Sequence, residues 1–418
     1  MARDRAGLRK RRDPVPARRL GADGWWLPTP VGTRVLAVSV LLLALSWPLG
    51  YPEAAVLGGG GLLAVLGAVA WVLPPLRVDA ARTVTPARVT RGDRAEAVVT
   101  VTVRGRRGAR RVDLEDACDG RPVAVSVADV APHAAAVTRY PLPTGRRGRL
   151  AVGPLHAVRA DPAGLARRAR RCADDTAVLV RPRVHPLPLL ASGRAHHIEG
   201  PDSASADGGS QTFHTLRAYV MGDDLRRIHW RSTARTGELM VRQMVDVSMP
   251  RTTVVLDTRG AAYPGLPERA ADAFELAVEA AASVCCAALL HRFPLRLLTE
   301  GGIALADSAR GSAGEELLDV LAVVAVSEGT SAADAFDELD RSRADGTLVV
   351  VTGTGDTAGF GGLAKVSGRF ERVLVVRVGG AAAAADEAPA SALPAGTPYV
   401  YAASAEVLVT VWQREAAR

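Results

Sequence analysis

Cysteine and lysine are scarce in this chain of 418 residues, which has four cysteines and only two lysines among its 52 basic side chains. None of the cysteines, at Cys118, Cys172, Cys285 and Cys286, belongs to the CxxC spacing that is typical of zinc sites. The adjacent Cys285 and Cys286 lie in a predicted helix, where they cannot easily bridge to each other. We therefore expect small core residues with reduced thiols, and no disulfide framework.

Three common catalytic motifs are absent as well. The sequence contains no GxxxxGK[ST] phosphate loop, no HExxH zinc motif and no GxSxG nucleophile elbow. These absences argue against a P-loop NTPase, a zincin protease and an α/β-hydrolase. The glycine run Gly58–Gly61 lies within an apolar segment, so it is predicted to serve helix packing or kinking rather than phosphate binding.

Two long apolar segments lie near the N-terminus. Val31–Leu49 contains one arginine near its start, and Ala54–Leu73 contains no charged residue. Each is about long enough to cross the hydrocarbon core of a bilayer. Only a short turn separates them, so the sequence predicts a transmembrane hairpin over residues 30–74. Basic residues flank both spans, which predicts a two-span protein of the cell membrane whose N- and C-termini both lie in the cytoplasm.

Residues 1–29 precede this hairpin and show no apolar periodicity. They are charged and contain proline and glycine, which favours a disordered basic tail in the cytoplasm. The alternative is a cleaved signal peptide within residues 1–50. The apolar run begins late, is too long for such a signal and is followed directly by a second span, so we favour the hairpin.

Charge is distributed unevenly along the chain. Residues 253–418 carry 13 basic and 22 acidic side chains, a net charge of −9, which leaves +17 for residues 1–252. The basic half is the membrane-proximal half, and three arginine clusters stand out in it. They lie at Arg104–Arg111, Arg146–Arg149 and Arg167–Arg171. These clusters are candidates for binding anionic headgroups or nucleic acid, and solvated loops are the alternative.

The chain beyond the hairpin divides by pattern into three parts. Residues 78–182 contain short β-branched runs between Gly, Pro and Arg-rich turns, which predicts a small antiparallel β-sandwich-like domain. Residues 183–251 are expected to form an exposed loop followed by a motif-rich segment. Residues 252–418 alternate strands and helices, which predicts an α/β domain with a mostly parallel sheet. The short connection across Glu300–Gly302 predicts one antiparallel edge strand.

The segment Thr212–Gln243, here named the signature segment, is unusually dense in charged, aromatic and hydrogen-bonding residues. It contains an Arg-x-Tyr, a Gly-Asp, an Arg-x-Ile-x-Trp and a Thr-Ala-Arg in close succession. Its named positions are Arg217, Tyr219, Gly222, Asp223, Arg227, Ile228, His229, Trp230, Thr233, Ala234 and Arg235. This order resembles the core motif of the bacterial family called domain of unknown function 58. The upstream run Gly148–Leu165 resembles the same family.

The resemblance implies both a fold and a function. Members are membrane-anchored proteins with a von Willebrand factor A-like domain, a Rossmann-type α/β fold, which corresponds here to residues 252–418. The resemblance further implies a partnership with MoxR-type AAA+ ATPases, in which this domain acts as an adaptor. We therefore expect a protein-interaction scaffold and not an enzyme.

The loop after the first strand of the α/β domain is a candidate site, because ligands of open parallel sheets bind beyond the carboxyl ends of the strands. In von Willebrand A domains this loop carries Asp-x-Ser-x-Ser, whose oxygens hold a divalent cation. The chain keeps Asp257 but has Arg259 and Ala261 at the two serine positions. Mg²⁺ needs several oxygen ligands, so this is a degenerate site at best. We hypothesise that Arg259 or a signature arginine pairs with Asp257 instead.

Several interpretations of the signature segment stay open. It is either a structural network, in which Asp223 pairs with nearby arginines and Trp230 anchors in the core, or a docking surface. A hydrolase that uses Asp223, His229 and the hydroxyl of Ser232 or Thr233 is the enzymatic alternative. An anionic-lipid or nucleic-acid binder that uses the basic half is a further alternative, with nucleic acid the less favoured ligand.

Overall fold

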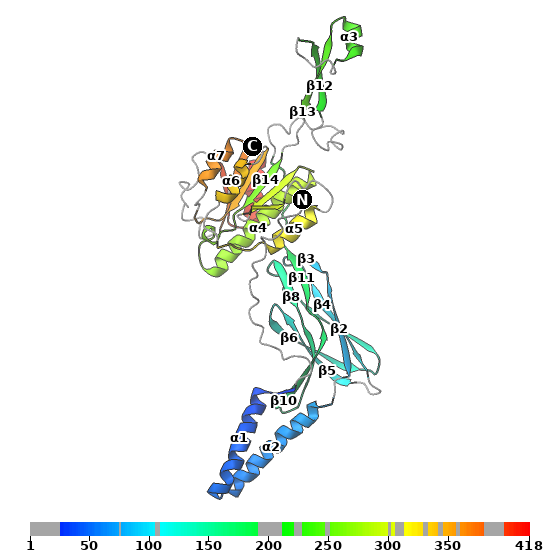
Figure 1. Ribbon diagram of the computed structural model, residues 1–418, viewed down its shortest axis with the longest axis vertical. Coiled ribbons are helices and arrows are strands. Elements are labelled where there is room, and N and C mark those ends of the chain that lie inside the picture. The colour runs from blue at the N-terminus through cyan, green and yellow to red at the C-terminus, as the bar shows by residue number, and fades with distance from the viewer. Residues whose placement is uncertain are drawn as a thin grey trace. The chain divides into compact units, whose positions relative to one another are not determined.

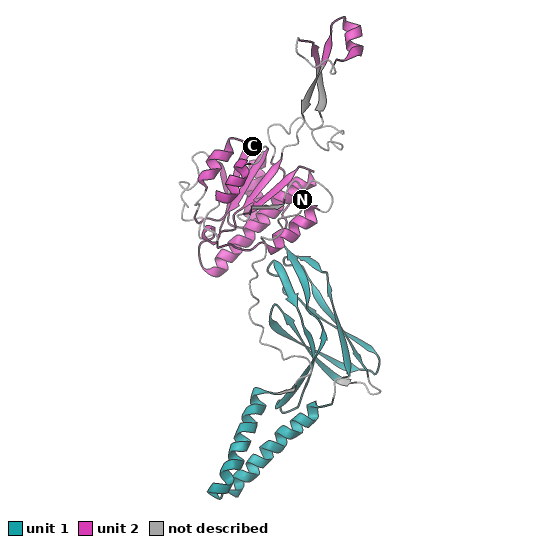
Figure 2. Cartoon of the chain, in the orientation of Figure 1, with its two compact units in different colours: residues 1–181 teal, residues 182–418 magenta. Residues whose placement is uncertain are grey.

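The structure is a computed structural model whose chain divides into two compact units, residues 1–181 and 182–418 (Figure 2). We call them the N-terminal and the C-terminal unit. The structure describes residues 26–74, 77–104, 109–190, 211–220, 228–246, 251–299, 302–305, 313–328, 333–341, 346–356, 360–379 and 397–418. The predicted tail therefore lies outside the described residues as far as residue 25, as do most of the loop before the signature segment and residues 380–396.

Two apolar helices, α1 (Pro30–Leu49) and α2 (Pro52–Val72), form an antiparallel pair (Figure 1). Helix α1 begins where Thr29 accepts a hydrogen bond from the Gly32 amide at 3.0 Å, and it ends at Gly50, whose φ of 67° favours glycine. The helices approach closely at Ser39, because a Cβ at Gly58 would lie 2.8 Å from the Ser39 carbonyl oxygen. A Cβ at Gly61 would overlap the Ser39 hydroxyl. The packing role predicted for this glycine run is thus confirmed at Gly58 and Gly61.

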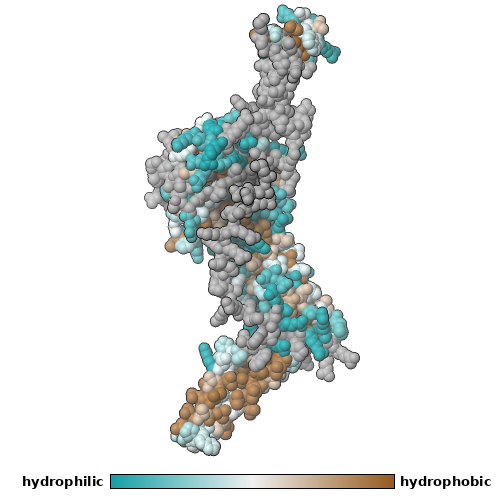
Figure 3. All heavy atoms as spheres, viewed as in Figure 1, coloured by the Kyte–Doolittle hydropathy of each residue, from teal (hydrophilic) through white to brown (hydrophobic). Residues whose placement is uncertain are grey.

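Three helices of the described residues are long and apolar enough to span a membrane: α1, α2 and α4 (Pro267–Leu290). The three helices differ in how much of their apolar segment is buried inside the protein. This share is 67% for α4, 11% for α1 and 22% for α2. Helix α4 is therefore a core helix, whereas α1 and α2 present apolar side chains on their surface (Figure 3). The two N-terminal helices fit membrane association.

The rest of the N-terminal unit is built from β-strands. Their bounds are β1 Trp26–Pro28, β2 Val78–Thr85, β3 Arg88–Thr90, β4 Glu96–Val103, β5 Ala109–Cys118, β6 Arg121–Val130, β7 Ala135–Pro141, β8 Gly148–Val152, β9 Leu155–Ala160, β10 Ala166–Ala173 and β11 Thr176–Arg181. One sheet has the order β1-β10-β9-β5-β8-β11-β3, with β6 paired to β5, and the other has the order β2-β4-β7. Alternate residues such as Val99, Val101 and Leu114 pack between the two sheets in one core.

One strand pair differs from the antiparallel sandwich that we expected. Strand β3 pairs with β11 in parallel, with Arg88 opposite Leu179. Strand β3 has only three residues and lacks an alternating apolar run, so its sequence carries no signal for this pairing.

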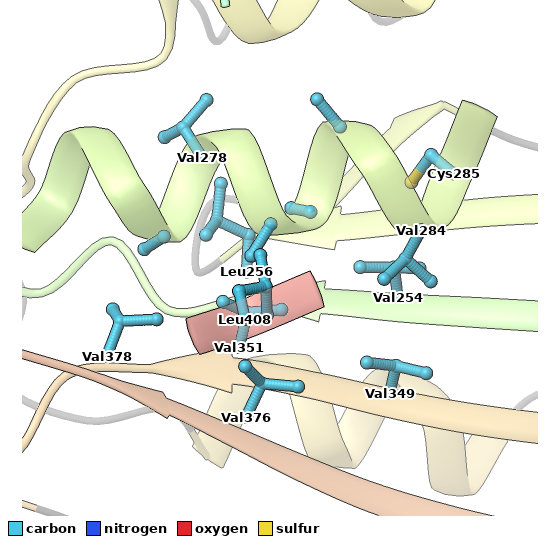
Figure 4. Close-up of a cluster of buried hydrophobic side chains, with 14 of the residues drawn as sticks. Val254, Leu256, Val278, Val284, Cys285, Val349, Val351, Val376, Val378 and Leu408 are labelled. Carbon is cyan, nitrogen blue, oxygen red and sulfur yellow. The ribbon is translucent and has the colours of Figure 1, made fainter. Parts of the chain in front are cut away.

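The C-terminal unit contains an α/β sheet with the strand order β16-β15-β14-β17-β18-β19. All neighbours pair in parallel except β16, which is antiparallel to β15 as predicted. The elements are β14 Thr252–Leu256, α4, β15 Leu295–Thr299, β16 Gly302–Leu305, α5 Ala313–Val323, α6 Ala333–Arg341, β17 Thr347–Thr352, α7 Gly361–Ser367, β18 Arg372–Val378, β19 Tyr399–Ala402 and α8 Ala405–Ala416. Apolar side chains of α4 pack on valines and leucines of the central strands (Figure 4).

Residues 183–190, the described start of the segment expected to form an exposed loop, have no regular secondary structure, but several of them contact the α/β core. Leu187 and Leu190 are buried in the α/β core, and the indole of Trp412 in α8 donates to the Pro188 carbonyl at 2.8 Å. The amide of His185 donates to the Ser283 hydroxyl of α4 at 2.8 Å. Pro186 and Pro188 suit this extended segment, because proline has no amide hydrogen to donate to a strand partner.

Candidate functional site

The described part of the signature segment is a β-hairpin that carries a short helix. Strands β12 (Gln211–Ala218) and β13 (Met240–Asp246) pair antiparallel, and α3 (Trp230–Thr236) lies in the connection (Figure 1). Ile228 and Val241 form an isolated β-bridge, and both are buried. The helix begins there because His229 caps it and ends at Gly237, whose φ is 77°.

His229 is the N-cap of α3. Its Nδ1 accepts a hydrogen bond from the Ser232 amide at 3.2 Å and lies 2.7 Å from the Ser232 hydroxyl. The next residue, Thr233, uses its hydroxyl to accept the Met240 amide at 3.0 Å, which ties α3 to β13. His229 and Ser232 are therefore adjacent in space as well as in sequence. The short helix alone explains their contact, because its first amides need acceptors.

Trp230 lies on the surface of this hairpin, with 67% of the residue exposed. The interpretation in which Trp230 anchors in the core is therefore wrong for this structure. Arg217, Arg231 and Arg235 are exposed as well, and Tyr219 is half-buried, with its amide donating to the Leu239 carbonyl at 2.7 Å. Gly222, Asp223 and Arg227 lie outside the described residues, and so do the ionic pairs that we predicted for Asp223.

The second candidate site lies at the carboxyl end of β14, where the strand order reverses between β15 and β17. Asp257 directly follows β14, and its carboxylate is held from several sides. Arg259 donates from Nε to Oδ1 at 2.9 Å and from Nη2 to Oδ2 at 2.8 Å. The hydroxyl of Thr352, the last residue of β17, donates to Oδ2 at 2.7 Å. The Arg259 amide also donates to Oδ1, at 3.1 Å.

This ion pair is closed to solvent. The side chains of Arg259 and Asp257 are 0% and 1% exposed. Arg259 also donates to the Asp356 carbonyl at 2.9 Å, and its guanidinium carbon lies 5.7 Å from the centroid of the Phe360 ring. The hydroxyl of Tyr263 donates to the Asp257 carbonyl at 2.6 Å. Each part of the carboxylate and most of the guanidinium thus has a protein partner, as burial of charge requires.

The loops around this pair fill the crevice that the strand reversal would otherwise open. The amides of Gly355 and Asp356 donate to the carbonyls of Ala262 and Ala261 at 2.9 and 3.0 Å. A Cβ at Gly353 would overlap the Ala262 carbonyl, so only glycine allows this approach. The described parts of these loops therefore cover Asp257 and Arg259.

A second buried arginine, Arg377 of β18, supports the same loop. It donates to the Thr354 carbonyl at 2.9 Å, and its residue is 3% exposed. Burial lowers the pKa of the Arg377 guanidinium, while Tyr399 and Tyr401 favour its charged form. Nothing in the local sequence pattern singles out Arg377, because its strand is mostly an apolar run.

The family comparison covers both candidate sites. The model described as "Protein of unknown function DUF58" matches residues 215–390, from within β12 to beyond β18. This region belongs to the DUF58 family. No curated protein matches the chain.

Two solved structures share little with the chain. One is the Pseudomonas fluorescens alkylpurine DNA glycosylase AlkC bound to DNA containing an abasic site analog, at 16% identity and a TM-score of 0.19, covering 36% of this chain and 47% of that one. The other is Cwp6 from Clostridium difficile, at 10% identity and a TM-score of 0.14, covering 72% of this chain and 37% of that one. The chain thus spans less than half the length of either protein. At such TM-scores neither likeness informs the fold or the function.

The DUF58 region offers a poor set of donors for a metal ion at Asp257. Mg²⁺ needs several oxygens around the carboxylate, but a guanidinium already occupies both carboxylate oxygens. Of the oxygens near this pair, the Thr352 hydroxyl contacts Asp257, whereas the Asp356 carbonyl accepts from Arg259. Over the described ranges, no three His, Cys, Asp or Glu side chains gather as a metal would require.

Four arginines of these clusters form ion pairs within the described part of the N-terminal unit. Arg104 pairs with Asp79, and Arg111 pairs with Asp113 at 2.7 Å. Arg167 pairs with Glu115, and Arg171 lies 3.0 Å from Asp174. Residues 105–108 lie outside the described part. The basic character of these clusters is thus reduced wherever a carboxylate lies within reach.

Proposed function

We propose that this chain is a membrane-anchored scaffold or adaptor that binds another protein, and that α1 and α2 cross the membrane with both termini in the cytoplasm. The partner that the family resemblance implies is a MoxR-type AAA+ ATPase. We assign its docking to the signature hairpin. The supporting observation is Trp230, a large aromatic side chain that is 67% exposed on a backbone fixed by the His229 cap and the Thr233 hydroxyl. Exposed aromatics on a fixed backbone are typical anchors of protein interfaces.

The charges around Trp230 fit such an interface. Arg231 and Arg235 lie on the same short helix and are exposed. Tryptophan and arginine are the residues most enriched at interface hot spots. Arginine also recognises carboxylates through two parallel hydrogen bonds, so we propose an acidic patch on the partner.

We propose further that the α/β sheet is von Willebrand factor A-like and that its cation position is held by Arg259. Support comes from the strand order with one antiparallel edge strand and from Asp257 after the first strand. In this proposal no metal ion bridges the α/β domain to a partner, because the carboxylate that would hold the ion is neutralised inside the protein.

The test is purification of the intact protein from its own membranes in mild detergent, with an ATP analogue and Mg²⁺ or with EDTA, followed by mass spectrometry of the proteins that co-purify. Wild type is expected to enrich an AAA+ ATPase. Trp230→Ala is expected to lose it, and Trp230→Phe to retain part of it. Val323→Ala is the matched control, since Val323 is 58% exposed at the end of α5.

Either of two results would contradict the proposal. One is enrichment of the same ATPase by Trp230→Ala at the wild-type level. The other is the absence of any AAA+ ATPase from the wild-type sample under both nucleotide conditions. Hydrogen exchange at the Ser232 and Thr233 amides checks that each variant keeps helix α3.

A further inference from the structure

The turn between β9 and β10 is fixed to the ends of both N-terminal helices. The Thr29 amide donates to the Leu165 carbonyl at 3.0 Å, and the Thr29 hydroxyl donates to the Gly164 carbonyl. A Cβ at Gly32 would overlap the Leu165 carbonyl oxygen. Leu165 and Ala166 share a buried cluster with one face of α2, made of Val65, Ala68 and Val72, and with Val35 and Leu36 of α1. The β-strands are therefore attached to the helix pair by more than its two chain connections.

This attachment sets the position of the arginines of β10. In the sheet, Leu27 lies opposite Arg167 and Trp26 opposite Arg168, only a few residues before α1 begins. Arg168 also donates to the Leu73 carbonyl, at the residue that follows α2. Strands advance about 3.3 Å per residue, so these arginines lie within about 10 Å of the helix ends. If the helices span the membrane as proposed, that is the depth of the lipid headgroups.

Two arginines lie directly opposite each other at this level. Arg159 of β9 is the cross-strand neighbour of Arg168 of β10. Like charges in that arrangement destabilise a sheet unless an anion lies between them or beside them. Arg168 meets a carbonyl at the end of α2, where the helix dipole carries a partial negative charge. Arg159 has no ion pair with a residue that the structure describes.

Neighbouring carboxylates are already engaged and do not neutralise this pair. Glu115 binds Arg167, and Asp113 binds Arg111. The buried Asp161 accepts the amides of Ala163 and Ala166. These interactions leave the Arg159 and Arg168 pair with an excess of positive charge.

We propose that Arg159 and Arg168 together bind the phosphate of an anionic phospholipid. A phosphate diester accepts hydrogen bonds from both guanidinium groups and removes their mutual repulsion. Arg34 in α1 and Arg77 after α2 are exposed at the same ends of the helices and add positive charge there. Both arginines of the pair are half-buried, which suits a single headgroup better than the long backbone of a nucleic acid. This inference rests on the proposed membrane-spanning hairpin.

The test uses the full-length protein in nanodiscs of phosphatidylcholine, with or without phosphatidylglycerol. Retained lipid is counted by native mass spectrometry, and thermal stability is recorded in parallel. Wild type is expected to retain phosphatidylglycerol selectively and to unfold at a higher temperature in its presence. Arg159→Gln is expected to lower the apparent affinity for phosphatidylglycerol about fivefold, the effect of one basic residue near a charged membrane. Arg139→Gln, an exposed arginine of β7, is the matched control and should behave as wild type.

A second variant separates lipid binding from a general loss of charge. Arg159→Glu places a carboxylate opposite Arg168, so it should be more stable than wild type in phosphatidylcholine and gain nothing from phosphatidylglycerol. The proposal is overturned if Arg159→Gln retains phosphatidylglycerol as wild type does. It is equally overturned if a single-stranded oligonucleotide displaces the lipid at equal phosphate concentration.

Failure of this inference can be told from failure of the proposed function. Extraction of the wild-type protein from its membranes by alkaline carbonate would contradict the spanning hairpin itself. The Arg159→Gln variant can also stay in the carbonate-washed membrane and still capture the ATPase. If that variant keeps its selectivity for phosphatidylglycerol, the result contradicts the headgroup site alone.

Discussion

The guanidinium of Arg259 grips both carboxylate oxygens of Asp257, at 2.9 Å from Nε to Oδ1 and 2.8 Å from Nη2 to Oδ2. Both side chains are buried at the point where the strand order reverses, which is where open parallel sheets usually bind ligands. A buried ion pair stabilises the folded protein little more than an apolar pair of the same shape. Removal of one partner, however, leaves an unpaired buried charge that destabilises the fold strongly. The pair therefore specifies one closed arrangement of the loops after β14 and β17.

Removal of either partner alone should destabilise the protein strongly. Arg259→Ala leaves an unpaired buried carboxylate, and we expect a loss of about 3–5 kcal/mol in the free energy of unfolding. The double variant Asp257→Ala/Arg259→Ala should lose much less than the sum of the single variants, because neither charge remains. Pulse proteolysis of the full-length protein in detergent measures these differences. Additive losses would mean that the two side chains do not act as a pair.

Introduction of the two serine hydroxyls of the von Willebrand A loop should create a cation site where Arg259 now lies. In Arg259→Ser/Ala261→Ser the carboxylate of Asp257 is released and two serines stand at the spacing of a metal-binding loop. We expect Mg²⁺ to raise the unfolding temperature of this variant and to leave that of wild type unchanged. Addition of Asp257→Ala to the variant should abolish the effect. A calorimetric titration in which wild type binds Mg²⁺ through Asp257 would contradict the role assigned to Arg259.

The α/β sheet was the most predictable part of the fold. Strands β14 and β17 are short, continuous runs rich in β-branched residues, and α4 is a long amphipathic helix that begins with Pro267. Helix α7 starts with two glycines and β19 has four residues, so neither carries a pattern that predicts it. Elements of this length depend on tertiary contacts rather than on their own propensity.

The candidate sites were predictable only in part. Asp257 and Arg259 follow a recognisable first strand, so their neighbourhood could be expected from the sequence. The contact with Thr352 and the support from Arg377 depend on how segments far apart in the chain meet, which no local pattern records. The position of Trp230 was not predictable for a different reason. An aromatic residue is usually buried, and only the structure places it on the surface.

The role of His229 as a helix cap can be separated from a role as a catalytic base. His229→Ala removes the side-chain acceptor of the Ser232 amide, leaving only the His229 carbonyl, and should cost about 0.5–2 kcal/mol of local stability. Hydrogen exchange at the amides of Ser232 and Thr233 should then speed up. His229→Asn keeps a side-chain acceptor at the cap, so slow exchange and partner capture should both return.

A hydrolase would respond differently to the same two variants. An asparagine cannot take a proton from the Ser232 hydroxyl, so any hydrolytic activity would be lost in His229→Asn as well as in His229→Ala. Suppose that wild type has hydrolytic activity, and that His229→Asn loses it while exchange at the Ser232 amide stays slow. That result would favour the hydrolase and contradict helix capping as the sole role of His229.

The thiols of α4 should be slow to react at neutral pH. Burial raises the pKa of Cys286 to about 11 and that of Cys285 well above its usual value. Only about one Cys286 in a thousand is then a thiolate at pH 8, so alkylation by iodoacetamide should be slow and speed up about tenfold per pH unit. Because the folded pKa exceeds the unfolded one, this group stabilises the fold below about pH 8.5 and loses that contribution as the pH rises toward 11. Complete alkylation in denaturant is the control, and rapid alkylation of the folded protein at pH 8 would show that α4 does not form the closed core seen here.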